Sequence, residues 1–258
     1  MTSKIASRIH LFLITGWLPE LRDYKMNRKF HFLISIFFFA WNANAQWTLV
    51  NTGLCNPGVF SFAVIDSSIC VGTNIGVCLS SDNGNAWAPA TSSAPVLALV
   101  TDGANIFAGT EGNGVFLSTD KGVTWSAVNS GLTNLQIFSL AINGDHTFAG
   151  TEGGGVFLST DNGNTWNEVN SGLTNPDIRA FAINGSTIFA GTNGGGIFES
   201  VNNGTTWTAI NTGLPAGAWV RGLEFSGASI FAATDNGVYR STNNGSNWTA
   251  INTGLMNT

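Results

Sequence analysis

Short apolar runs alternate with glycine-rich breaks along residues 46–258. Runs of this length, bounded by residues that accept positive φ, are typical of strands joined by tight hairpins. The stretch from Arg179 to Asn211 therefore predicts four strands, each pairing with the next in an antiparallel sheet. They cover residues 179–183, 188–192, 196–200 and 206–211.

One octet recurs five times, and the strands around it repeat with it. Successive copies start 38, 41, 41 and 41 residues apart. Self-similarity at a period of about 40 residues indicates a repeat architecture. The copies are SSDNGNAW from Ser80, STDKGVTW from Ser118, STDNGNTW from Ser159, SVNNGTTW from Ser200 and STNNGSNW from Ser241.

A sheet of this kind carries apolar side chains on both faces, as at Phe181, Ile188 and Phe189, and cannot cover them alone. Stacking the sheets around an axis lets each cover its neighbour, which is the β-propeller solution for units of about 40 to 45 residues. A β-solenoid would also stack its repeats, but its units are usually shorter. We expect an all-β fold, a β-propeller of about five four-stranded antiparallel blades.

The repeat region begins and ends on the same element. WTLVNTGL at 47–54 matches the fourth strand and its exit at 207–214 and at 248–255, so six fourth strands accompany five sets of the other three. We favour a closed five-bladed ring with one surplus strand over a section of a longer array, or over two chains that complete a larger ring. An open array would expose apolar sheet faces and promote self-association.

The octets resemble the Asp-box repeat of bacterial neuraminidases, SxDxGxxW with Thr commonly before the Trp, and the resemblance covers essentially all of residues 46–258. It implies that each box forms the turn between the third and fourth strands of a blade. It implies little about activity, because similar repeats occur in sialidases, some glucan hydrolases, the sortilin ectodomain and plant-type photosystem assembly factors.

The box residues have a structural explanation that needs no ligand. The acid or amide accepts backbone N–H groups across the turn, the glycine takes a left-handed conformation, and the tryptophan packs into the adjoining sheet. The later Glu of an EF-hand is missing, so a calcium site is not expected. The residues in these roles are Asp82, Asp120, Asp161, Asn202, Asn243, Trp87, Trp125, Trp166, Trp207 and Trp248.

Residues 1–45 differ from the repeats and contain six of the ten Lys and Arg residues. From Met26 a basic start precedes an apolar run over 32–41 and then Ala43-Asn44-Ala45, which predicts a secretory signal peptide at 26–45. The run is shorter than the about 20 residues of a membrane-spanning helix, so we expect no stable membrane insertion after cleavage. Residues 1–25 are then an upstream extension, either untranslated or a longer basic region. The mature protein is expected to be secreted, to the extracellular space, the cell surface or the periplasm.

The predicted mature chain is acidic. Its four basic residues stand against thirteen acidic ones, so its net charge is 4 − 13 = −9. Such a chain cannot neutralise a phosphate backbone, which excludes nucleic acid as a partner. No metal-ligand pattern or cofactor motif is visible, and we expect neither metal nor cofactor.

Three cysteines in an exported chain leave at least one unpaired. Cys70 and Cys78 replace aromatic residues on the second and third strands of the first copy. We predict a Cys70–Cys78 disulfide, with two small buried thiols as the alternative. Cys55 has no evident partner.

Candidate binding residues gather on the face formed by the loops that enter the first strand and leave the second. The irregular loop at 215–219 carries Trp219, and Arg179 and Arg221 occupy equivalent positions in the innermost strands. An aromatic platform beside two guanidiniums can receive a sugar or a carboxylate, although a packed Trp and two solvated Arg would also explain them. The residues that follow the second strands are predicted to form a circle of acids and amides around the channel mouth, although they could also be simple turn residues. They are Asn74, Glu111, Glu152, Asn193 and Asp235.

The residues give weak support to catalysis. A sialidase resemblance implies three clustered arginines and a Tyr/Glu nucleophile pair, but Arg240 lies on a third strand and Tyr239 replaces a core Phe. Glu111 and Glu152 could form a glycosidase pair with carboxyls about 5 to 9.5 Å apart, yet their equivalent positions indicate repetition. We therefore predict a non-enzymatic module that binds an extracellular protein or glycan. An Asp-box glycoside hydrolase, sialidase-like or glucan hydrolase-like, is the alternative.

Overall fold

The computed structural model describes residues 50–90 and 94–256, so the predicted signal peptide and upstream extension lie outside the described residues. Twenty strands form five four-stranded sheets, and every strand pairs antiparallel with the next one along the chain. This arrangement confirms the predicted all-β fold with five meandering sheets. Within the described residues no helical segment has the length and hydropathy that a bilayer crossing requires.

The sheets follow the sequence repeats one for one. The first contains β1 (Val59–Ile65), β2 (Ser68–Thr73), β3 (Gly76–Ser80) and β4 (Ala88–Pro89). The second and third contain β5 (Val96–Thr101), β6 (Ile106–Thr110), β7 (Gly114–Ser118), β8 (Ser126–Ala127), β9 (Ile137–Asn143), β10 (His146–Thr151), β11 (Val156–Ser159) and β12 (Asn167–Glu168). The last two contain β13 (Ile178–Asn184), β14 (Thr187–Thr192), β15 (Ile197–Ser200), β16 (Thr208–Ala209), β17 (Val220–Ser226), β18 (Ser229–Thr234), β19 (Gly237–Ser241) and β20 (Thr249–Ala250).

Each octet forms the turn between the third and fourth strands of a sheet. In the third copy Ser159 Oγ donates to Asp161 Oδ1 (2.8 Å), and the backbone N–H of Gly163 donates back to Ser159 Oγ (2.8 Å). Asp161 Oδ1 also accepts the backbone N–H of Thr165 (2.8 Å). The turn needs two left-handed residues, Asn162 at φ 57° and Gly163 at φ 81°, which explains the Asn-Gly or Lys-Gly pair at its centre.

The tryptophan that ends each of the third, fourth and fifth octets ties its sheet to the preceding one. Trp166 Nε1 donates to the carbonyl of Val128 and Trp207 Nε1 to that of Val169, both at 2.8 Å. Trp125 differs, because it donates to Gly122 of its own turn. An indole that is buried and hydrogen-bonded in this way satisfies its N–H and contributes apolar area to the junction between two sheets.

An amide replaces the carboxylate in the last two octets without loss of the hydrogen bonds. Asn202 Oδ1 accepts from Ser200 Oγ (2.9 Å) and from the backbone N–H of Thr206 (2.9 Å). Asn202 Nδ2 donates to Thr206 Oγ1 (2.9 Å), whereas in the third octet Thr165 Oγ1 donates to Asp161 Oδ2 (2.6 Å). The threonine hydroxyl therefore reverses its role, and charge is not required for the turn.

The carboxylates of the first three octets are stabilised in their ionised form. The hydroxyl of Thr124, and then its backbone N–H, hold the pKa of Asp120 at about 2, and similar hydrogen bonds lower the pKa of Asp82 and Asp161. A group whose pKa is lower in the folded state contributes stability above its unfolded pKa of about 4, and this contribution is lost as pH falls through the folded pKa.

We expect the triple variant Asp82→Asn, Asp120→Asn, Asp161→Asn to keep the fold and to lose less stability than the parent between about pH 5 and pH 2. The amide preserves the turn, as at Asn202, but does not titrate. Melting temperatures followed by circular dichroism across this range test the expectation. Asn202→Asp is the matched control and should steepen the loss; equal slopes in parent and triple variant would contradict it.

Neighbouring sheets approach closely because the second strand of each preceding sheet offers a glycine. A Cβ added to Gly150 would lie 2.6 Å from Cγ2 of Ile178, and one added to Gly191 would lie 2.6 Å from Cγ1 of Val220. Gly72 and Gly109 face the next sheet in the same way. The first residue of each following inner strand therefore packs on backbone, which sets the spacing of the sheets.

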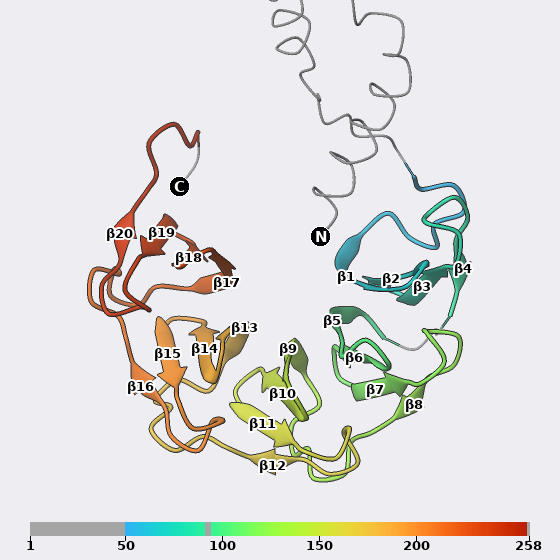
Figure 1. Cartoon of the computed structure of the whole chain (residues 1–258), viewed down its shortest axis with the longest axis horizontal. Coiled ribbons are helices and arrows are strands. Elements are labelled where there is room, and N and C mark those ends of the chain that lie inside the picture. The colour runs from blue at the N-terminus through green and yellow to red at the C-terminus, as the bar shows by residue number, and fades with distance from the viewer. Residues whose placement is uncertain (1–49, 91–93, 257–258) are drawn as a thin grey trace, which may run out of the picture. The chain divides into compact units, whose positions relative to one another are not determined.

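The five sheets follow one another along an arc, and the first strand of each packs on the first strand of the next (Figure 1). The described residues show no such packing between β17 and β1. Val59 is 45% exposed, whereas its equivalents Val96, Ile137 and Ile178 are buried. The prediction of a closed five-bladed ring is therefore wrong.

The last sheet departs from the repeat at the position that packs on a following sheet. Ala233 stands where the other four sheets have the glycine against which the next inner strand packs. Glu224 and Arg240 each pair with Phe231 of the strand between them, so their side chains lie on the same face of the sheet as Phe231. Both charged residues are exposed. The free face of the last sheet is thus partly charged.

The free face of the first sheet is apolar. Phe62 is 70% exposed and Val64 is 49% exposed, although both belong to the inner strand β1. Equivalent positions in the interior sheets pack on the preceding sheet, as Phe181 does on Phe148 with ring centres 6.4 Å apart. The same sequence position is therefore core in one sheet and surface in another.

We expect Phe181→Ala to lower the free energy of unfolding by roughly 3 kcal/mol, because it opens a cavity between two sheets. Phe62→Ala, its matched control at the same position of the repeat, should change stability by no more than about 0.5 kcal/mol. Urea denaturation of both variants measures the difference. A large loss for Phe62→Ala would mean that the first sheet is covered in solution and would contradict the open face.

The cysteine pairing differs from the prediction. Cys55 and Cys78 form the disulfide, and Cys70 is a buried free thiol. The register explains the error: Cys70 pairs with Leu79 and Cys78 with Val71, so the two cysteines point to opposite faces of the sheet. Burial raises the pKa of the Cys70 thiol to about 11, which keeps it protonated at neutral pH.

Candidate functional site

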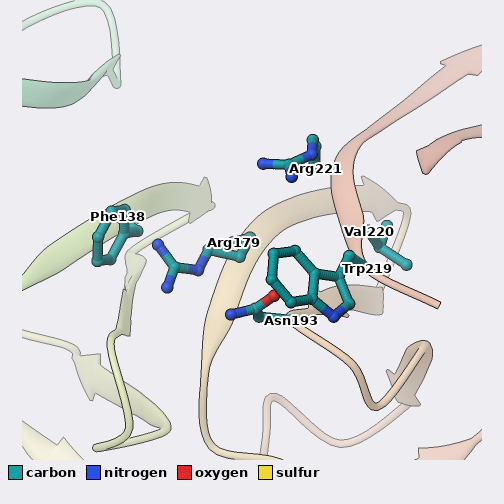
Figure 2. Close-up of a pocket in the computed structure, with 6 residues that line it drawn as sticks. All are labelled: Phe138, Arg179, Asn193, Trp219, Val220 and Arg221. Atoms are coloured by element: carbon teal, nitrogen blue, oxygen red, sulfur yellow. The ribbon is translucent and has the colours of Figure 1, made fainter. Parts of the chain in front are cut away.

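A pocket of about 350 Å³ lies where the inner strands of the last three sheets begin (Figure 2). Each sheet contributes from its first strand or from the loop beside it. The lining residues are Phe138 of β9, Arg179 of β13, Asn193 just after β14, Trp219 just before β17, and Val220 and Arg221 of β17.

Irregular pairing at the start of each inner strand positions the two arginines. The register between β13 and β14 shifts between Ile178 and Ala180, and that between β17 and β18 shifts between Val220 and Gly222. Arg179 and Arg221 are the residues skipped at these two β-bulges. A bulge turns its extra side chain away from the normal alternation, and here it directs both arginines to the pocket.

Arg179 is held by carboxylates of its own chain. Its Nε lies 2.8 Å from Asp177 Oδ1, and its Nη2 donates to Asp177 Oδ2 (2.9 Å) and to Glu152 Oε1 (3.1 Å). The guanidinium also stacks over Phe138, 3.8 Å from the ring centre, and Figure 2 shows it pointing toward that ring. Its charge is therefore compensated and its geometry fixed.

The backbone of Trp219 is anchored while its side chain stays open. Its N–H donates to Asp235 Oδ1 (3.1 Å), and its carbonyl accepts the N–H of Asp235 (3.2 Å). On the other side Trp219 forms an isolated β-bridge with Asn193. The indole is nonetheless 44% exposed, so a rigid backbone presents a large aromatic surface to solvent.

Arg221 has no carboxylate partner within the described residues. Its guanidinium carbon lies 5.5 Å from the centre of the Trp219 ring, a distance at which the cation and the indole attract each other. The side chain is exposed. The site therefore combines one free cation, one fixed and compensated cation, and an open indole.

Only some of the predicted site residues lie together in the structure. Trp219, Arg179, Arg221 and Asn193 line one pocket, while Glu152 and Asp235 hold two of these residues in position. Glu111 is not among the lining residues and pairs through its backbone with Gln136. Phe138 and Val220 were missed, although Phe138 holds the same repeat position as Arg179 and Arg221 and could have been found by aligning the copies.

The residues that line this pocket include no carboxylate or imidazole that could act as a catalytic acid or base. Glu152 is engaged with Arg179, and Glu111 lies outside the lining. Across residues 50–90 and 94–256, no three His, Cys, Asp or Glu side chains gather to hold a metal ion. The arrangement offers recognition of a planar or apolar surface and of an anion.

No protein-family model and no curated protein matches the sequence. Solved structures share the fold at low identity. The extracellular domain of BT4673 from B. thetaiotaomicron has a TM-score of 0.64 and 17% identity over 75% of this chain, and an ancestral GH74 enzyme has 0.61 and 20% over 79%. YCF48 bound to D1 peptide has a TM-score of 0.59 and 16% identity over 74% of this chain and 67% of its own.

These similarities show that the sheets are arranged as in β-propeller proteins. At this level of identity they show the fold alone and not the function. The chain spans 27% of the BT4673 domain and 33% of the GH74 enzyme. Propellers with this arrangement thus include extracellular domains, an enzyme and a protein that binds a peptide.

Proposed function

We propose that this chain is an exported, non-enzymatic Asp-box propeller module that binds an extracellular protein or glycan through the pocket around Trp219 and Arg221. One observation carries the proposal: the Trp219 indole is open while its backbone is pinned by Asp235 and Asn193. A group that is already rigid loses little conformational entropy on binding, so preorganised aromatic surfaces are efficient anchors.

The assignment to Asp-box repeats rests on the octets and on their turns. The Ser-Asp and Gly-Ser hydrogen bonds recur in the first, second and third copies, and asparagine takes the place of the acid in the others. Export rests on the predicted signal peptide at 26–45 and is consistent with the extracellular domains among the structural neighbours.

A binding role is favoured over hydrolysis by the use of Glu152. Its carboxylate is 3.1 Å from Arg179 and serves to fix that side chain. A glycosidase needs two carboxyl groups in different environments across one substrate bond, and the pocket lining contains neither Glu111 nor Glu152. Hydrolysis of a glycan by the purified protein would instead support the glycoside hydrolase alternative.

We expect Trp219→Ala to weaken the binding of whichever ligand the purified protein selects on glycan and peptide arrays by at least about tenfold, or 1.4 kcal/mol, since it removes the central aromatic anchor. Val201→Ala, which changes a 67% exposed apolar residue in an octet turn, is the control and should bind as the parent does. Titration calorimetry measures both.

Two results would contradict the proposal. One is full affinity in Trp219→Ala. The other is hydrolysis of an arrayed glycan by the parent that is abolished by Glu111→Gln or by Glu152→Gln, which would establish the hydrolase instead.

A further inference from the structure

We infer that the pocket recognises a sugar bearing a single carboxylate, a uronic acid residue within an otherwise neutral glycan, with Arg221 binding the carboxylate and Trp219 the sugar face. This inference rests on the proposed function and adds the class of ligand. It follows from the different surroundings of the two arginines, because Arg179 is paired with carboxylates and Arg221 is not, within the described residues.

The charges around the pocket leave room for one anion. Arg179 is met by both Asp177 and Glu152, so its positive charge is already matched. Arg221 has no such partner within the part of the chain that the structure describes. Guanidinium groups bind carboxylates through two parallel hydrogen bonds, and Arg221 is the group free to do so.

The same charges oppose a second anion. Glu152 and Asp177 accept hydrogen bonds from Arg179, and Asp235 accepts one from the backbone N–H of Trp219, so carboxylates contact two of the residues that line the pocket. Like charges brought together in an interface oppose binding. A polyuronate would meet this repulsion, whereas a neutral sugar next to the uronate can donate hydroxyl hydrogen bonds to these oxygens.

The apolar surface of the pocket suits a sugar ring better than an amino-acid side chain. Trp219 is its open aromatic surface, because the Phe138 ring is covered by the guanidinium of Arg179 at 3.8 Å. The exposed indole can stack on the C–H face of a pyranose ring. A guanidinium 5.5 Å from the indole centre is then within reach of a carboxylate that projects from the ring edge.

Methyl glucoside and methyl glucuronide, which differ at one carboxylate, test the inference on the full chain. The NMR signal of the Trp219 indole N–H, assigned by its loss in Trp219→Phe, reports each titration. We expect the glucuronide to bind at least about tenfold more tightly than the glucoside. Arg221→Gln should remove that preference by weakening glucuronide binding more than glucoside binding, and Arg221→Lys should restore part of it.

The outcomes separate the inference from the proposed function. Equal affinity of the parent for the two sugars, or an equal effect of Arg221→Gln on both, overturns the inference while sugar binding itself stands. Tighter binding of polyglucuronate per residue, or binding of an acidic peptide but of neither sugar, also overturns it. Failure of Trp219→Ala to weaken any ligand overturns the proposed function as well.

Discussion

The fold depends on one constraint, which is that the interior sheets have two apolar faces and each face must be covered by a neighbouring sheet. Glycines such as Gly150 and Gly191 on the second strands let the next inner strand lie directly against backbone. The tryptophans of the last three octets then join the outer edges, as Trp207 does with Val169. The same repeated residues therefore form the octet turns, set the spacing between inner strands and connect the outer edges of neighbouring sheets.

The candidate site uses a part of the repeat that this constraint leaves free. The bulged residue of each inner strand is not buried in the core between the sheets, so it can differ, as it does among Phe138, Arg179 and Arg221, while the core stays the same. Variation at this position changes the chemistry of the pocket while the sheets stay alike. Arg179 and Arg221 share a position but differ in role, because only Arg179 has Asp177 beside it.

Repetition made most of the fold predictable from the sequence. The four strands of each unit, the octet turns and the gathering of Trp219, Arg179 and Arg221 all follow from position within the unit. What depends on register or on a single departure from the repeat was harder to predict. A one-residue difference in pairing placed Cys70 and Cys78 on opposite faces, and Ala233 replaces the glycine against which the next inner strand packs in the other sheets. The ion pair between Arg179 and Glu152 joins residues 27 positions apart and depends on side-chain geometry that no repeat specifies.

The alanine at 233 also bears on how such an array can grow. A copy of the repeat inserted between two interior sheets would find a glycine ahead of it and present one behind it, so duplication there preserves both junctions. A copy added after the last sheet would instead meet a methyl group and two charged side chains. Lengthening by internal duplication is therefore the easier route in evolution, and an engineer who wished to extend the end of the array would first have to restore glycine at that one position.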